Sequence, residues 1–252
     1  MTQAANTFAQ RSDQYAQARP RYPRALFDWI IAHCPARGAA WDCATGNGQA
    51  AVDLAPYFLQ VQATDVSAEQ VAQGLGAPNV IYSAQPAEQT GFAKSSFDLV
   101  TVAQALHWFD YARFWPEVRR VTRPGALFCA WGYAWFECEQ EVLDTFVTPF
   151  RALLEPHWAA NNRILWDGYR DADIAFPFAR LPVPRLQVEE RWTIAQLIEY
   201  MQTWSAWKRA QEDTRKAQAL AGLIEAAQKR FGGAGALEIT MPLAIVAGYL
   251  HI

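Results

Sequence analysis

Short apolar segments alternate with amphipathic ones through the first half of the chain. This alternation predicts repeated strand–helix units, which place parallel strands in one sheet with helices on its faces. The expected strands span residues 39–44, 61–65, 79–83, 96–104 and 126–133, and the expected helices span 46–58, 66–75 and 109–125. Ser67 and Gln70 form a capping signature at the start of the second helix.

The pattern changes after Tyr133. Pro149 is expected to kink or split a helix there, because proline removes a backbone donor from the helix interior. The expected elements are a helix at 138–158, an irregular segment at 161–185, a strand at 185–193, helices at 193–209 and 212–231, and a buried strand at 236–250. The paired glycines Gly232 and Gly233 would end the last helix.

The composition is that of a globular, soluble protein. The chain has 252 residues, of which 52% are hydrophobic and 19% charged, enough for one large α/β domain or a domain with a modest insertion. No apolar run approaches the roughly 18 residues of a membrane helix, so no membrane partner is expected. A net charge of −3 argues against a surface built to neutralise phosphates, so nucleic acid is not an expected partner.

Two features favour a cytoplasmic location. The four cysteines form no CxxC pair and lie in apolar contexts, which indicates reduced, buried thiols; they are Cys34, Cys43, Cys129 and Cys138. The first fifteen residues lack the apolar core of an export signal. We expect a monomer or a homodimer.

A glycine turn at residues 41–50, WDCATGNGQA, is the first candidate ligand site. Gly46, Gly48 and Ala51 match the GxGxxA pattern of dinucleotide-binding turns, and Asp65 follows about twenty residues later, where it could hold a ribose. Asp42 does not suit a pyrophosphate. Two like charges about 4–6 Å apart cost about 3–4 kcal/mol at an effective dielectric constant near 20.

Two cofactors therefore remain open at this turn. S-adenosylmethionine has no phosphate and carries an ammonium and a sulfonium, which the carboxylate of Asp42 could attract. Asp65 suits either cofactor, because each has a ribose diol. The alternative to a methyltransferase is an NAD-dependent oxidoreductase.

The turn belongs to a larger set of motifs that resembles the class I S-adenosylmethionine-dependent methyltransferases. The acid-x-Gly-x-Gly-x-Gly pattern of that family is matched by Asp42, Ala44, Gly46 and Gly48, and its acid after the second strand by Asp65. Further matches are the segments 85–88, 96–100 and 120–128, so that the resemblance covers roughly residues 8–133. Ala44 departs from the pattern, since the family keeps glycine there. This departure motivates a third reading, a cofactor-binding protein of this fold that has lost methyl transfer.

Other segments look like a narrower group, the methyltransferase type 11 and trans-aconitate methyltransferase-like branch, which methylates small acceptors. They are YAQARPRYP (15–23), AQALHWFD (103–110), WG (131–132), FPF (176–178) and TWSAW (203–207). The resemblance implies that Tyr15 and Arg19 face the methionine carboxylate, a contact that a guanidinium suits. It places other cofactor residues beside the adenine (Val66, Ala87 and Glu88) or on the methyl-transfer side (Ala103, Gln104 and His107).

The resemblance also implies an architecture. We expect a doubly wound, seven-strand, mostly parallel sheet of the Rossmann-like methyltransferase type, in which the last strand, near 237–249, runs antiparallel at or beside the sheet edge. Residues 1–133 and 209–252 would form the cofactor-binding core, and 134–208 an inserted, mostly helical cover that binds the acceptor. Candidate acceptor contacts are Arg21, Trp108, Trp131, Tyr133, Arg163, Tyr169, Trp204 and Lys208.

Methyl transfer is an in-line displacement that depends mainly on positioning and on exclusion of water. A carboxylate acceptor needs no general base, whereas a hydroxyl or amine benefits from one, and His107 is the candidate. A structural role for His107, hydrogen-bonded at a strand exit, stays open beside the catalytic one. The other histidines (His33, His157 and His251) lack metal-ligand spacing, so no metal site is expected.

Overall fold

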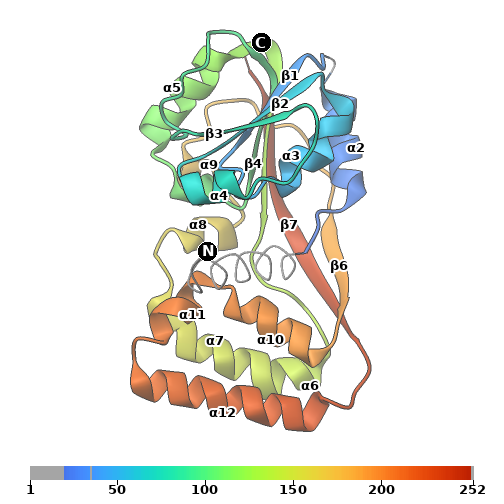
Figure 1. Ribbon diagram of the computed structural model, residues 1–252, viewed down its shortest axis with the longest axis vertical. Helices are drawn as coiled ribbons and strands as arrows, with labels where there is room; N and C mark the ends of the chain where they lie inside the picture. The colour runs from blue at the N-terminus through green and yellow to red at the C-terminus, as the bar shows by residue number, and fades with distance from the viewer. Residues whose placement is uncertain (1–19, 35, 251–252) are drawn as a thin grey trace, which may run out of the picture. The chain divides into compact units, whose positions relative to one another are not determined.

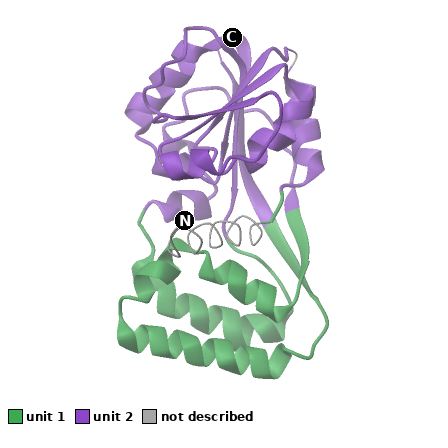
Figure 2. Cartoon of the chain, in the orientation of Figure 1, with its two compact units in different colours: residues 1–21, 135–160, 188–241 green, residues 22–134, 161–187, 242–252 purple. Residues whose placement is uncertain are grey.

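The computed structural model describes residues 20–34 and 36–250, and they divide into two compact units (Figure 1) (Figure 2). Among the described residues, unit 1 comprises 20–21, 135–160 and 188–241, and unit 2 comprises the remainder. The strands form one seven-stranded sheet in the order β3-β2-β1-β4-β5-β7-β6. The predicted α/β class and seven-strand sheet are confirmed.

The strands follow the predicted segments closely. Their bounds are β1 (Ala39–Cys43), β2 (Gln60–Asp65), β3 (Val80–Ala84), β4 (Phe97–Ala103), β5 (Thr122–Tyr133), β6 (Gln187–Trp192) and β7 (Leu237–Tyr249). The ladders between neighbours among β1–β5 are all parallel, and β7 pairs antiparallel with β5. The antiparallel last strand is therefore as expected.

The helices of unit 2 cover both faces of its strands. They are α2 (Arg24–His33), α3 (Gln49–Leu54), α4 (Ala68–Ala72), α5 (Tyr111–Val121), α8 (Asn162–Trp166) and α9 (Asp171–Ile174), with 3-10 turns at Ala55–Tyr57 and Leu106–Trp108. Because side chains alternate along a strand, Trp41 and Cys43 pack in one apolar cluster with α5, whereas Ala40 packs in the other with α2 and α3.

Unit 1 is mostly helical. Its elements are α6 (Gln140–Val142), a π turn (Leu143–Val147), α7 (Thr148–Leu154), a 3-10 turn (Glu155–His157), α10 (Ile194–Gln202), α11 (Ser205–Ala210) and α12 (Thr214–Phe231). Helix α7 contacts α11 and α12, and α10 contacts α12. Tightly packed side chains of this unit include Phe146, Phe150 and Leu197.

Two expectations about unit 1 are corrected. Pro149 does not split the helical segment, because it lies in the first turn of α7, where its missing N–H is tolerated, and the π turn leads directly into that helix. The expected helix at 193–209 is two helices, because the backbone of Trp204 is extended (φ −65°, ψ 140°) between α10 and α11.

The boundaries of the two compact units differ from those expected for the core and the cover. Residues 161–187 belong to unit 2, and residues 209–241 belong to unit 1. An acceptor-binding role for a cover at 134–208 stays a prediction. Within the described residues, no helix has the length and apolar character needed to cross a membrane.

Candidate functional site

The strand order reverses between β1 and β4, and the predicted cofactor residues follow the carboxyl ends of the strands on either side. Register brings these ends together, since Cys43 pairs with Thr64 of β2 and with Val102 of β4. Ligands of open α/β sheets bind at such reversal points. The fold therefore gathers the motif residues at one edge of the sheet in unit 2.

The glycine turn leaves β1 with three left-handed residues. Ala44, Gly46 and Gly48 have φ values of 54°, 58° and 90°, and the turn closes with the amide of Gly48 donating to the carbonyl of Thr45 at 2.9 Å. A Cβ on Gly48 would lie 1.9 Å from the phenolic oxygen of Tyr82. Only glycine fits residue 48 beside that ring.

Ala44 holds a conformation that glycine adopts without strain. A left-handed φ costs an L-residue about 1–2 kcal/mol, which explains physically why the motif has glycine there. Ala44 is nevertheless accommodated, and the turn around it keeps its hydrogen bonds, including Thr45 N–H to the carbonyl of Thr64 at 2.8 Å.

Asp42 lies inside the turn with no exposed surface. Its Oδ1 accepts a hydrogen bond from the hydroxyl of Thr101 at 2.8 Å, and its Oδ2 accepts one from the hydroxyl of Thr45 at 2.5 Å. Burial raises the pKa of Asp42 to about 6, although these hydroxyls and the amide of Ala51 lower it in part, and the charge of Asp65 adds to the rise. Asp42 therefore organises the turn from within.

Asp65 joins the turns that follow β1 and β2. Its Oδ2 accepts from the amide of Gly46 at 2.9 Å, and its Oδ1 accepts from the amide of Ser67 at 2.8 Å. A carboxylate offers about four acceptor positions, so this one retains capacity for further donors. Val66, the next residue, has 80% of its surface exposed.

The segment after β3 carries the expected adenine contacts. Ala87 is buried, with 8% exposure. Glu88 accepts a hydrogen bond from the amide of Asp110 at 3.1 Å. The backbone of Gln85 donates to the carbonyl of Asp65 at 2.9 Å, which ties this segment to the acid that ends β2.

The methyl-transfer side is built around Gln104, which follows β4 and Ala103. Gln104 has a left-handed backbone (φ 58°), and its amide donates to the carbonyl of Trp131 at 2.8 Å. A Cβ on Gly132 would lie 3.1 Å from Gln104 Oε1 and 3.3 Å from the hydroxyl of Tyr169. Polar groups of Gln104 and Tyr169 therefore converge beside β5.

His107 joins this polar group from the 3-10 turn after β4. It is 3% exposed, and its Nδ1 lies 3.1 Å from the hydroxyl of Tyr169. Burial lowers the pKa of His107 to about 4, so the imidazole is neutral near pH 7, and its tautomer decides whether Nδ1 donates or accepts. Trp108, beside it, is 47% exposed.

The expected acceptor contacts fall into different environments. In unit 2, Trp131 is fully buried, with its ring edge-to-face against Tyr22 and Phe27, so it packs as a core residue. Tyr133 and Tyr169 are also buried, whereas Arg163 is exposed. Within unit 1, Trp204 is buried, and Arg21 and Lys208 are exposed. Tyr15 and Arg19 lie outside the described residues.

Unit 1 contains an aromatic group that includes Trp204. The ring centroids of Trp135, Trp158 and Trp204 lie 5.7–5.8 Å from one another. The guanidinium carbon of Arg151 lies 3.5 Å from the ring centroid of Trp135, a cation–π contact. Arg151 was missed by the sequence reasoning, and its position among the apolar residues of helix α7 is the signal that could have identified it.

Two further groups of the turn were missed, the hydroxyl of Thr45 and the ring of Tyr82. The signal for Thr45 is its place between Ala44 and Gly46, within the turn motif itself. Tyr82 gives no such signal, because an aromatic residue in a strand is usually a packing residue.

A separate hollow of about 730 Å³ lies at the other edge of the sheet, near the amino ends of β4 and β5. Lining it are Lys94, Ser95, Trp115, Pro116, Arg119, Arg120, Thr122 and Pro124. None of the predicted site residues lines this hollow, so it is distinct from the candidate site.

Comparisons with known proteins identify what this arrangement resembles. A family model described as "Methyltransferase domain" matches residues 41–130. A protein of Anaeromyxobacter dehalogenans, assigned as a type II methyltransferase, has a solved structure with 41% identity and a TM-score of 0.78, covering 92% of this chain and 97% of that one. A Dictyostelium discoideum protein assigned as a methyltransferase is 29% identical over 204 residues, 79% of this chain and 77% of its own. The YcgJ structure from Bacillus subtilis shares the fold, with 18% identity, a TM-score of 0.52, and coverage of 89% and 97%.

Proposed function

The chain belongs to the S-adenosylmethionine-dependent methyltransferases, and from this premise we propose that it methylates a small molecule at a carboxylate or hydroxyl oxygen. Family membership confirms the class I methyltransferase resemblance. It therefore argues against the alternative function, that of an NAD-dependent oxidoreductase. The narrower trans-aconitate-like branch stays a prediction.

The observation that carries the cofactor assignment is the position of Asp65. Its carboxylate is fixed by the amides of Gly46 and Ser67, which lie in the turns after β1 and β2. A ribose diol supplies two hydroxyl donors, and this carboxylate retains acceptor capacity for them. We propose that Asp65 holds the ribose and that the exposed side chain of Val66 lies against the adenine.

The charge pattern around the turn supports a cationic cofactor. No lysine or arginine occurs in residues 38–93, whereas Asp42, Asp65 and Glu88 all do. A pyrophosphate at this turn would meet these carboxylates, and residues 38–93 supply no cationic side chain to offset them. The ammonium and sulfonium of S-adenosylmethionine would instead be attracted to the same region, so the residues present fit that cofactor.

Bound S-adenosylmethionine would supply a methyl group on a positively charged sulfur, which leaves with its electron pair as a neutral thioether. The protein's task is then to align the acceptor and exclude water. We assign the alignment to the polar group formed by Gln104, His107 and Tyr169. The amides of Gln104 and Tyr169 donate to the carbonyls of Trp131 and Ile164, and the absence of a side chain on Gly132 makes room for this group.

His107 has a defined role in this proposal only when the acceptor carries a proton. Within the described residues, Nδ1 of His107 is held by Tyr169, and we assign Nε2 to the acceptor. A hydroxyl would donate its proton to Nε2 as the new O–CH₃ bond forms. A carboxylate acceptor would transfer no proton, and His107 would then contribute only shape and polarity.

The proposal is tested by calorimetric titration with S-adenosylhomocysteine and with NAD. We expect binding of the first and none of the second. Asp65→Ala should weaken S-adenosylhomocysteine binding by about 1–3 kcal/mol, because it removes a charged acceptor. Glu69→Gln is the matched control, since Glu69 is an exposed acid on the adjacent helix α4. Equal affinity of wild type and Asp65→Ala would remove Asp65 from the site.

Methyl transfer itself is measured with labelled S-adenosylmethionine and a panel of small carboxylic acids and alcohols. Labelled product from either class supports the proposal and names the class. Cofactor binding with no product from any acceptor would favour the third sequence-based reading, a cofactor-binding protein that has lost transfer.

A further inference from the structure

The segment between β3 and β4, residues 85–96, has no helix or strand of its own. It carries Ala87 and Glu88, which the proposed function places beside the adenine. Its first residue is fixed at one end, because Gln85 donates its amide to Asp65, its side-chain Nε2 to Ser83 and accepts from the amide of Gly91. The middle of the segment is fixed by a different group of side chains.

Glu117 of helix α5 binds the middle of this segment through its carboxylate. Its Oε1 accepts from both the amide and the hydroxyl of Thr90, at 2.7 and 2.6 Å. Glu117 is 7% exposed, so it is a nearly buried acid in a helix whose exposed face is polar. Burial alone would raise its pKa, but hydrogen bonds from Arg120 and Thr90 lower the pKa overall.

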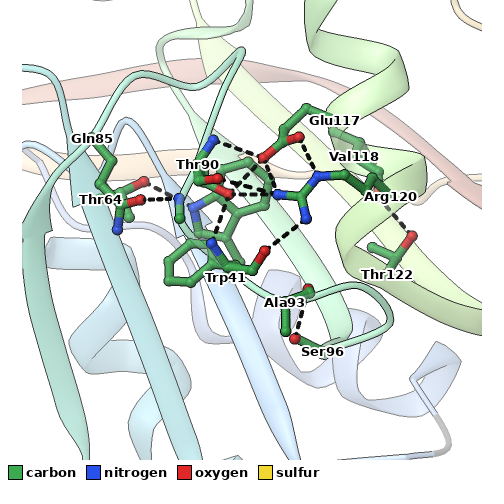
Figure 3. Close-up of polar contacts among 12 residues, drawn as sticks. Trp41, Thr64, Gln85, Thr90, Ala93, Ser96, Glu117, Val118, Arg120 and Thr122 are labelled. Atoms are coloured by element: carbon green, nitrogen blue, oxygen red, sulfur yellow. Dashed lines mark hydrogen bonds and ion pairs between the residues drawn. The ribbon is translucent and has the colours of Figure 1, made fainter.

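Arg120 completes the group from one helical turn further along α5. Its Nε donates to Oε2 of Glu117 at 2.7 Å and its Nη2 to Oε1 at 2.6 Å, a two-point pairing. Its Nη1 also donates to the carbonyl of Phe92 at 2.7 Å. Figure 3 shows Glu117 and Arg120 facing Thr90 across this set of contacts. We call Thr90, Glu117 and Arg120 the α5 clamp.

The α5 clamp is connected to the strand that enters the glycine turn. The ring of Phe92, whose carbonyl the clamp holds, lies edge-to-face against Trp41, with centroids 5.9 Å apart. Trp41 is fully buried and donates its indole N–H to the hydroxyl of Thr64 at 2.8 Å. Trp41 directly precedes Asp42, so the clamped segment packs against the base of the proposed cofactor site.

We propose that Glu117 and Arg120 are positioning residues that set the adenine side of the cofactor site by fixing residues 85–92. The inference rests on the proposed function, because it assumes that Ala87 and Glu88 contact the adenine. Neither clamp residue touches the cofactor in this proposal. They act by holding the middle of an irregular segment, in addition to the contacts that Gln85 and Glu88 make.

A second arginine–acid pair in the same unit provides a matched comparison. Arg123 pairs with Asp98 at 2.7 Å, and Asp98 also accepts from the amides of Gly38 and Ala39. Asp98 is 4% exposed, close to the exposure of Glu117. This pair holds the amino ends of β1 and β4, and it makes no hydrogen bond to the described residues 85–92. The two pairs share chemistry and burial, and they differ in what they hold.

The test compares Glu117→Gln with Asp98→Asn in the full-length protein. Calorimetry with S-adenosylhomocysteine and with adenosine measures the whole cofactor and its adenine–ribose part. We expect Glu117→Gln to weaken both by about tenfold, the equivalent of one hydrogen bond to a charged group. Asp98→Asn should lower the melting temperature without changing either affinity. Arg120→Lys, which keeps the charge but loses the two-point pairing, should weaken binding less than Glu117→Gln.

Hydrogen exchange read by mass spectrometry locates the effect. Amides of residues 85–92 should exchange faster in Glu117→Gln and at the wild-type rate in Asp98→Asn. If Glu117→Gln does not fold, Thr90→Val removes one clamp contact and takes its place. Affinities unchanged in the clamp variants, or weakened equally in Asp98→Asn, would overturn the positioning role. A wild-type protein that binds neither probe would instead overturn the proposed function.

Discussion

The phenolic oxygen of Tyr82 occupies the space that a side chain at residue 48 would need. A Cβ on Gly48 would lie 1.9 Å from that oxygen, and the hydroxyl itself donates to the carbonyl of Leu75 at 2.8 Å. The side chain of Tyr82, on β3, therefore packs directly against the glycine turn. Glycine at 48 is required twice, for its left-handed φ of 90° and for this close approach.

Gly48→Ala should therefore destabilise the protein by about 2–4 kcal/mol, combining backbone strain with overpacking. Urea denaturation of the variant gives the free energy of unfolding. The double variant Gly48→Ala/Tyr82→Phe, which removes the nearest oxygen, should recover part of the loss. Full stability of the single variant would contradict the close packing.

Ala44→Gly should have the opposite sign. Glycine relieves the left-handed strain at φ 54°, but it also raises the conformational entropy of the unfolded chain. The net gain in the free energy of unfolding is therefore about 0.5–1 kcal/mol. Ala51→Gly, in the first turns of helix α3, is the control and should lose about 1 kcal/mol. A loss in both variants would indicate that the methyl of Ala44 has packing value that outweighs the strain.

The stability contributed by Asp42 should fall as pH rises from about 4 to 6. Burial raises its folded pKa from 3.8 to about 6, so the native state keeps a proton that the unfolded chain releases earlier. Over that range, the native state binds more protons, and stability declines by about 3 kcal/mol from this group.

Asp42→Asn removes this dependence. Relative to the wild type, the free energy of unfolding of the variant should rise by a similar amount between pH 4 and pH 7. Urea denaturation at each pH measures it. An equal stability difference at both values would show that Asp42 titrates normally.

His107 should act in the reverse direction. Burial lowers its folded pKa from 6.5 to about 4, so the stability that it contributes is present at pH 7.5 and is lost on acidification below 6.5. At pH 5 the loss is about 2 kcal/mol. The free energy of unfolding of His107→Gln should therefore lie closer to that of the wild type at pH 5 than at pH 7.5, by that amount.

Tyr169→Phe removes the hydroxyl beside His107 Nδ1. It should cost about 1–2 kcal/mol, because a buried ring nitrogen loses its hydrogen-bond partner. Nuclear magnetic resonance of the imidazole nitrogens measures the tautomer directly. The wild type should show one tautomer, and Tyr169→Phe a mixture. An unchanged spectrum would mean that Tyr169 does not select the tautomer.

The strands and the turn could be predicted because their signals are local. Apolar runs and glycines with fixed spacing depend on a few neighbouring residues, and the pairing of Ser67 with Gln70 is seen as a side-chain cap, with the Gln70 amide donating to Ser67 at 3.3 Å. The resemblance then supplied the number of strands and the antiparallel direction of the last one. The resemblance did not predict which side chains contact each motif residue.

The environment of the site residues could not be predicted, because it depends on long-range contacts. The presence of aspartate at residue 42 does not show whether its carboxylate faces a ligand or two threonine hydroxyls, one of them 59 positions away in the sequence. Glu117 and Arg120 look like an ordinary surface pair on an amphipathic helix. Their burial depends on where the segment after β3 crosses α5, and no periodicity records that crossing.

Strand β7 has a consequence for how the protein is made. Its residues 237–241 complete unit 1 and its residues 242–249 complete unit 2. A chain leaving the ribosome therefore holds neither unit in full until β7 has been synthesised, although domains commonly fold one after another during translation. Nascent chains stalled before residue 237 should remain sensitive to protease along their whole length, whereas released chains should resist it.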